Sequence, residues 1–138
     1  MKLSVIIIGL GNQSLTEHIP ALLRRNDIRI VGACDVSADA RENFKKQFPA
    51  IGYGTLVTDN LDELIEKTRP NIAIVAVPHD SYFDIVKKLC QNNIYFLKEK
   101  PFARNLLEAE SFMKIPNFGK LGFIAAQRRY NPLYQEAK

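Results

Sequence analysis

The sequence LSVIIIGLGNQS, at residues 3–14, decides the fold of this chain. Its first half is a short run of apolar, mostly β-branched residues, which is typical of a strand buried on both faces of a parallel sheet. Gly9 and Gly11 then predict a tight turn, and an amphipathic stretch follows from Ser14. A buried strand, a glycine turn and a helix in this order predict the first unit of an α/β protein.

Short apolar runs alternate with amphipathic stretches along the rest of the chain, which predicts a doubly wound parallel sheet between two layers of helices. The first helix is expected over about 14–25, burying Leu15, Ile19, Leu22 and Leu23, and Pro20 either kinks it or marks a late start. Strands are expected at 3–8, 28–34, 72–77, 94–97 and 121–126, with 51–54 as a short third strand or an extended loop. Helices are expected over about 37–47, 58–67, 80–92 and after Asn105, with a loop at 116–119 and a further helical start after Tyr130. Six strands of this kind predict a Rossmann sheet of order 3-2-1-4-5-6.

The composition is that of an ordinary soluble globular domain. The 138 residues fit one domain, and 46% are hydrophobic and 25% charged. Apolar runs reach about six residues, far short of the roughly 18 that a membrane span needs, and the N-terminal residues do not read as a signal peptide. We therefore expect a cytoplasmic protein without a membrane partner.

The net charge of +4 is spread in pairs such as Arg24–Arg25, Lys45–Lys46 and Lys87–Lys88. Each pair falls on the polar face of an expected helix, so it indicates a solvated surface that mildly favours anionic ligands. Such a distribution does not form the basic stripe of a nucleic-acid-binding protein.

Cys34 and Cys90 both lie in apolar patterns, which predicts buried, reduced thiols. His18 and His79 are far apart in sequence and have no nearby cysteine partner, so we expect no metal site. We expect His18 to have a surface or capping role.

The glycine turn and a later acid together predict a dinucleotide site. Gly9 and Gly11 would allow the backbone to approach a pyrophosphate, which Asn12 and Gln13 would meet at the helix N-terminus. Ser14 stands where a third glycine is usual and is small enough for close packing of helix and strand. The spacing from Gly11 to Asp35 is 24 residues, near the roughly 20 expected for an acid that binds a ribose. The alternatives are a plain strand–helix turn and a solvated loop acid.

Asp35 also favours NAD over NADP. A carboxylate accepts hydrogen bonds from ribose hydroxyls, whereas a 2′-phosphate beside it would cost about 4 kcal/mol per pair of like charges at an effective dielectric of 20. Val36 and Ser37 follow, so no arginine comes directly after the acid to compensate.

Two further segments end strands at the same predicted edge of the sheet. Val77–Pro78–His79 follows the fourth strand, and Glu99–Lys100–Pro101 follows the fifth. Lys100 would donate to a substrate hydroxyl or carbonyl and assist proton transfer, and Glu99 would orient Lys100 or contact a ribose of the cofactor. The alternative is a solvated pair of loop charges.

The chain resembles the N-terminal domain of the Gfo/Idh/MocA oxidoreductases over almost its whole length. The matching segments are Gly9-x-Gly11, Ala33–Cys34–Asp35, Val75–Ala76–Val77–Pro78, Lys98–Glu99–Lys100–Pro101 and Arg129–Tyr130–Asn131–Pro132. The resemblance implies that Lys100 is a catalytic residue near the nicotinamide and that Val77, Pro78 and His79 line the path of the cofactor.

The chain departs from the family pattern at three positions and in its length. Ser14 replaces a small glycine or alanine, His79 replaces a frequent asparagine, and Tyr82 replaces a frequent histidine. Family members continue into a second domain that binds substrate. We therefore expect a cofactor domain over residues 1–132 and the start of a connection at 133–138.

The resemblance implies hydride transfer between NAD and a sugar, polyol or related hydroxy compound, with poor turnover by this stretch alone. The alternative is a non-enzymatic nucleotide-sensing or interaction module that keeps the fold. Arg128 and Arg129 would contact cofactor or substrate, or form interface salt bridges. Self-association through a sheet face without its second domain is a further possibility, giving a homo-oligomer.

Overall fold

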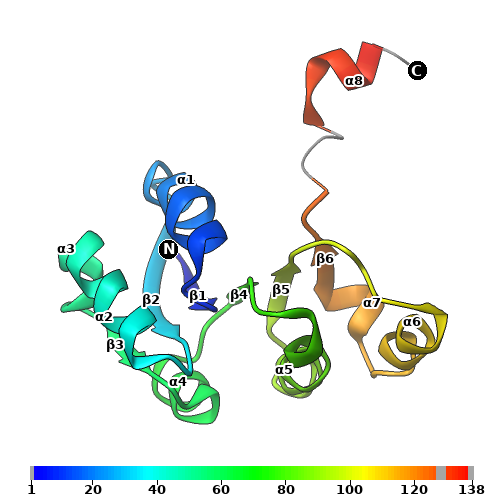
Figure 1. Cartoon of the computed structure of the whole chain (residues 1–138), viewed down its shortest axis with the longest axis horizontal. Helices are drawn as coiled ribbons and strands as arrows, with labels where there is room; N and C mark the ends of the chain where they lie inside the picture. Colours follow the sequence, from blue (N-terminus) through cyan, green and yellow to red (C-terminus); the bar gives the residue numbers. More distant parts are fainter. Residues whose placement is uncertain (1, 127–129, 137–138) are drawn as a thin grey trace.

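A computed structural model describes residues 2–126 and 130–136 of the chain. Its centre is a parallel sheet of six strands in the order β3-β2-β1-β4-β5-β6 (Figure 1). The strands are β1 (Leu3–Ile8), β2 (Ile28–Cys34), β3 (Leu56–Thr58), β4 (Ile72–Val75), β5 (Tyr95–Lys98) and β6 (Gly122–Ile124). The predicted fold class and strand order are confirmed.

Helices cover the two faces of this sheet in separate groups. One face carries the π-helix η1 (Ser14–His18), α1 (Ile19–Leu23), α2 (Ala38–Gln47) and α3 (Pro49–Gly52). The other carries α4 (Leu61–Thr68), the 3₁₀ turn η2 (His79–Ser81), α5 (Tyr82–Gln91), α6 (Leu106–Met113) and α7 (Phe118–Leu121). The last helix, α8 (Pro132–Glu136), projects from the body of the molecule (Figure 1).

Alternate residues of β1 supply both hydrophobic cores. Ile6 and Ile8 pack with α4, α5 and α6, whereas Val5 and Ile7 pack with α1 and α2. All four are almost completely buried. Because both faces of the strand are covered, the sequence shows a continuous apolar run instead of alternation.

The first helix contains a π-turn before Pro20. In a regular α-helix the proline ring would collide with the carbonyl of Thr16, four residues earlier. Here the Ile19 N–H bonds the Ser14 carbonyl, five residues back, and α1 follows from Ile19. Residues 12 and 13 are already helical, so the helix does not start late, and the π-turn accommodates Pro20 within it. Leu23 is 53% exposed and does not belong to the predicted buried face.

Several boundaries differ from the prediction. Residues 51–54 are neither a strand nor an extended loop, because Pro49 starts the short helix α3 and the third strand follows at Leu56–Thr58. Pro favours the first turn of a helix, since its missing N–H has no partner there anyway. Residues 118–121 form α7 instead of a loop, and β4 ends at Val75, two residues before Val77.

Side-chain caps define several helix starts. Ser37 Oγ accepts from the Ala40 N–H, and Asn60 Oδ1 accepts from two N–H groups of α4. Asn105 Oδ1 accepts from the Glu108 N–H at 2.9 Å. The return bond of a full capping box is absent from this pair, since the Glu108 carboxylate accepts from the Arg104 N–H instead. Within residues 2–126 and 130–136, no helix is long and apolar enough to cross a membrane.

Gly9 is the position where a side chain is least tolerable. Its φ is +89°, and a Cβ there would lie 2.2 Å from the Ala76 carbonyl oxygen. We expect Gly9→Ala to lower the free energy of unfolding by at least about 2 kcal/mol in urea denaturation, because strain and collision act together. Gly119→Ala is the control, since its Cβ would meet nothing within 4 Å. Equal stability of the two variants would contradict the expectation.

Candidate functional site

The ends of β1, β2, β4 and β5 bring the predicted site residues to one edge of the sheet, which we call the carboxyl edge. The residues placed there are Gly9, Gly11, Asn12, Gln13, Asp35, Val77, Pro78, His79, Glu99 and Lys100. Parallel strands bind ligands at this edge, where the strand order reverses between β1 and β4. Arg128 and Arg129 lie outside the described residues.

The glycine turn is fixed by backbone bonds to both neighbouring strands. The Gly9 N–H donates to the Cys34 carbonyl at the end of β2, and the Ala76 N–H beyond β4 donates to the Ile8 carbonyl. A Cβ built on Gly11 would meet nothing within 4 Å, so this glycine faces open space. The helix N-terminus after the turn therefore has room for an anion.

Ser14 ties the start of the helix back to the turn. Its side chain is completely buried, and Oγ donates to the Gly9 carbonyl at 2.5 Å. A glycine at this position could not make the bond. Ser14 was predicted only as a small packing residue, and its hydrogen bond was not predicted.

Asp35 is built into the turn as well as facing the edge. Oδ2 accepts from the Leu10 N–H at 2.7 Å, and Oδ1 accepts from the Ser37 N–H at 2.8 Å. Asp35 is therefore no solvated loop acid. A carboxylate oxygen accepts more than one hydrogen bond, so each oxygen retains capacity for a further donor.

Arg41 lies close to Asp35, although the sequence shows no arginine directly after the acid. Its guanidinium donates to the backbone carbonyls of Asp35 and Val36 at 2.6 and 3.1 Å. Its other terminal nitrogen lies 3.5 Å from the carboxylate of Asp59. The guanidinium is thus committed to protein oxygens. Arg41 was missed because it lies one helical turn into α2.

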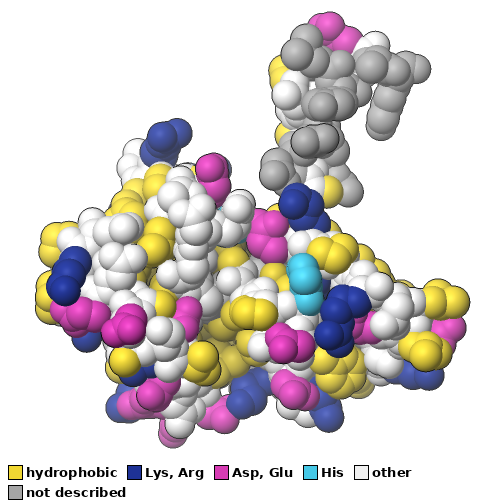
Figure 2. Space-filling view, in the orientation of Figure 1, with side chains coloured by type: hydrophobic (Ala, Val, Ile, Leu, Met, Phe, Trp, Pro, Cys, Tyr) yellow, Lys and Arg dark blue, Asp and Glu magenta, His cyan; other side chains and the backbone are white. Residues whose placement is uncertain are grey.

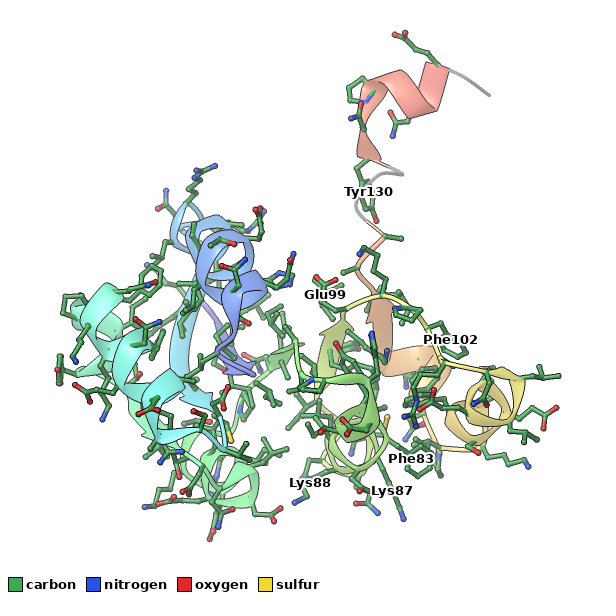
Figure 3. All side chains as sticks on the ribbon, in the orientation of Figure 1. Phe83, Lys87, Lys88, Glu99, Phe102 and Tyr130 are labelled. Carbon is green, nitrogen blue, oxygen red and sulfur yellow. The ribbon has the colours of Figure 1, made fainter. Side chains whose placement is uncertain are left out.

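Glu99 pairs with His18, against expectation. Its Oε1 lies 2.8 Å from His18 Nε2, and the two side chains are 13% and 15% exposed. Figure 3 shows Glu99 at the end of β5. The structure therefore joins Glu99 to the first helix, not to Lys100. The pair was missed because its members are 81 residues apart in sequence.

Lys100 projects at the carboxyl edge, and the residue two positions earlier is buried. Lys100 is exposed, and the peptide bond to Pro101 is cis. Lys98 is only 2% exposed, and its ammonium donates to the carbonyls of Glu99 and Pro101. The burial of Lys98 was not predicted, because the residue stands out in the sequence only as part of a motif.

An open groove of about 1080 Å³ lies against the face of β5 and β6 on the α1 side (Figure 2). Its walls include Tyr95, Phe123 and Tyr130, and its end nearest the carboxyl edge is formed by His18 and Glu99. The groove therefore borders the site, but it is not the glycine turn.

The described residues hold no group of three His, Cys, Asp or Glu side chains arranged to bind a metal ion. Cys34, next to Asp35, is a buried free thiol, as is Cys90. Burial, reinforced by the negative charges of Asp35 and Asp59, raises the pKa of Cys34 to about 11.

A raised pKa keeps the thiol protonated at pH 8, where the thiolate is the reactive form. We expect the folded chain to react with a thiol reagent such as 5,5′-dithiobis(2-nitrobenzoate) at least about a hundredfold more slowly than the unfolded chain. The rate of absorbance change in buffer and in urea measures this. A fast phase in the folded protein would contradict it.

Comparison with known proteins agrees with this arrangement. Over residues 3–117 the chain matches the Gfo/Idh/MocA family, described as "Oxidoreductase family, NAD-binding Rossmann fold". It is 26% identical over 140 residues to the uncharacterized oxidoreductase YhhX of Escherichia coli (strain K12), covering 100% of this chain and 39% of the relative.

Two solved structures share the fold. The WlbA dehydrogenase of Bordetella pertussis, in complex with NADH and UDP-GlcNAcA, has a TM-score of 0.86 at 20% identity, covering 100% of this chain and 41% of that one. KijD10, a 3-ketoreductase of Actinomadura kijaniata in complex with TDP-benzene and NADP, has a TM-score of 0.82 at 16% identity, covering 99% and 41%. The chain thus spans less than half the length of these relatives. Since the family match covers most of the chain, this protein belongs to the Gfo/Idh/MocA oxidoreductases and contains their NAD-binding Rossmann domain.

Proposed function

We propose that the chain binds NAD at the carboxyl edge and serves as the cofactor domain of an oxidoreductase acting on a sugar, polyol or related hydroxy compound. The observation that carries this is the bond from the Leu10 N–H to the Asp35 carboxylate. It joins the turn suited to a pyrophosphate to the acid suited to a ribose, and so forms one continuous cradle.

The residues of the cradle fit a dinucleotide. The pyrophosphate would lie over Gly11 at the helix N-terminus, with Asn12 and Gln13 beside it. Asp35 would accept hydrogen bonds from the hydroxyls of the adenosine ribose. The nicotinamide half would then reach the ends of β4 and β5, where the five residues proposed to contact it are Val77, Pro78, His79, Glu99 and Lys100.

Bound NAD supplies the hydride acceptor or donor for the reaction. In this proposal Lys100 donates a hydrogen bond or proton to the substrate oxygen, since its side chain is exposed at the edge. The WlbA complex with UDP-GlcNAcA supports a sugar-like substrate. Residues 1–132 would form the cofactor domain, residues 133–138 the start of a connection to a substrate domain, and the chain alone would turn over poorly. We also propose a cytoplasmic location, in keeping with the buried free thiols. A homo-oligomer is one of the assemblies that we expect.

The carboxylate of Asp35 predicts a preference for NADH over NADPH. A 2′-phosphate would lie against this carboxylate, and Arg41 is already held by two carbonyls and Asp59. We expect isothermal titration calorimetry at matched salt to give at least about tenfold tighter binding of NADH. Tighter binding of NADPH would contradict the assignment of NAD. Binding of neither would favour the non-enzymatic interaction module.

Removing the carboxylate tests the cradle itself. Asp35→Ala is expected to weaken NADH binding by about tenfold to a hundredfold, because hydrogen bonds to a charged group are lost. Asp39→Ala, at an exposed acid in the first turn of α2, is the matched control and should bind as the wild type does. Unchanged affinity in a folded Asp35→Ala protein would refute the role of this residue.

A further inference from the structure

Lys98 is a buried cation at the end of β5. Lysine is rarely buried unless its charge is paired, yet within the described residues no carboxylate lies within 4.0 Å of the Lys98 ammonium. Nζ instead donates to the Pro101 carbonyl at 2.7 Å and to the Glu99 carbonyl at 3.2 Å. These two carbonyls stand on either side of Lys100.

The aromatic rings of Tyr82 and Phe112, which we call the platform, lie against the Lys98 ammonium. Nζ lies 3.7 Å from the centre of the Tyr82 ring and 5.7 Å from that of Phe112. The Tyr82 ring is itself buried, and its hydroxyl donates to the Val75 carbonyl at the end of β4 at 3.3 Å. A cation over a desolvated aromatic face is attracted to it. The platform therefore fixes the ammonium relative to the ends of two strands.

The surroundings of Lys98 exclude a direct part in chemistry. Burial lowers the pKa of its ammonium, while the nearby charges of Glu108 and Glu99 oppose that shift. The small hollow beside it has no room for a ligand and is lined by His79, Tyr82, Pro101, Ala103, Arg104, Glu108 and Phe112. An apolar residue of the same size would fill the place without the cost of burying a charge. What the ammonium adds is two donors aimed at the turn.

We propose that Lys98 is a positioning residue for Lys100. The Lys98 ammonium lies against the Tyr82 ring and donates to the carbonyls of Glu99 and Pro101. These contacts fix the backbone on either side of Lys100, whose side chain reaches the nicotinamide end of the cradle. Tyr82 and Lys98 act as one unit in this role. The assignment rests on the proposed function, because the cofactor defines what Lys100 is positioned against.

Two ligands separate this role from a general effect on folding. NADH contains the nicotinamide half, whereas ADP contains only the adenosine and diphosphate that the glycine turn and Asp35 would bind. In the full chain we expect Lys98→Met, which keeps the apolar stem, to weaken NADH binding by about tenfold and to leave ADP binding within about twofold. Lys98→Arg, which retains donors and charge, should restore NADH binding. Lys87→Met, at an exposed lysine of α5, should change neither affinity.

The outcomes divide cleanly. Equal loss of both ligands, or loss of neither, in Lys98→Met would overturn the assignment. If that variant does not fold, Tyr82→Leu replaces it, with an expected loss of about threefold for NADH alone; equal loss of both ligands or of neither would overturn the assignment there too. A wild-type chain that binds neither ligand would overturn the proposed function, and the role of Lys98 with it.

Discussion

The hydrogen bond between the Leu10 N–H and the Asp35 carboxylate is the interaction on which the carboxyl edge depends. Gly9, directly before Leu10, adopts a φ of +89°, and the Leu10 N–H donates to the carboxylate of Asp35 after the end of β2. A residue with a Cβ would meet the Ala76 carbonyl in that conformation. Gly9 thus allows the Asp35 carboxylate to hold the turn, and the carboxylate oxygens keep lone pairs for further donors.

The fold could be predicted because its signals are local. The continuous apolar runs of β1 and β4, and the polar caps at Ser37 and Asn60, each act within a few residues. The error at 51–54 has a local cause too: Ile51 and Tyr53, each followed by a glycine, resemble a short strand, but Pro49 favours a helix start. Composition alone did not decide between the strand preference of Ile51 and Tyr53 and the helix-starting preference of Pro49.

The positions of the candidate residues along the sheet could be predicted from the sequence, whereas their contacts could not. Strand ends are ordered by topology, so Asp35 and Lys100 reach one edge once the strands are known. The partners of Glu99 and Lys98 depend on which face of the sheet each side chain enters. His18, which meets Glu99, lies in the π-turn before Pro20, so its place on the helix differs from that in a regular α-helix. No pattern along the sequence encodes such a pair over 81 residues.

The turn after β5 is held from both faces of the sheet because neighbouring residues of an extended chain point to opposite sides. Lys98 enters the layer of α5 and α6 and bonds backbone carbonyls, while Glu99 enters the layer of α1 and bonds a side chain. The Lys98 side chain is buried, whereas the contact of Glu99 with His18 borders the open groove. Lys98 and Glu99 carry opposite charges on the two sides of the sheet. Lys100 follows them, directly before Pro101, and is the exposed cation at the edge. The backbone of residues 98–101 is therefore held by contacts on both sides of the sheet, while the side chain of Lys100 is exposed and can contact a ligand.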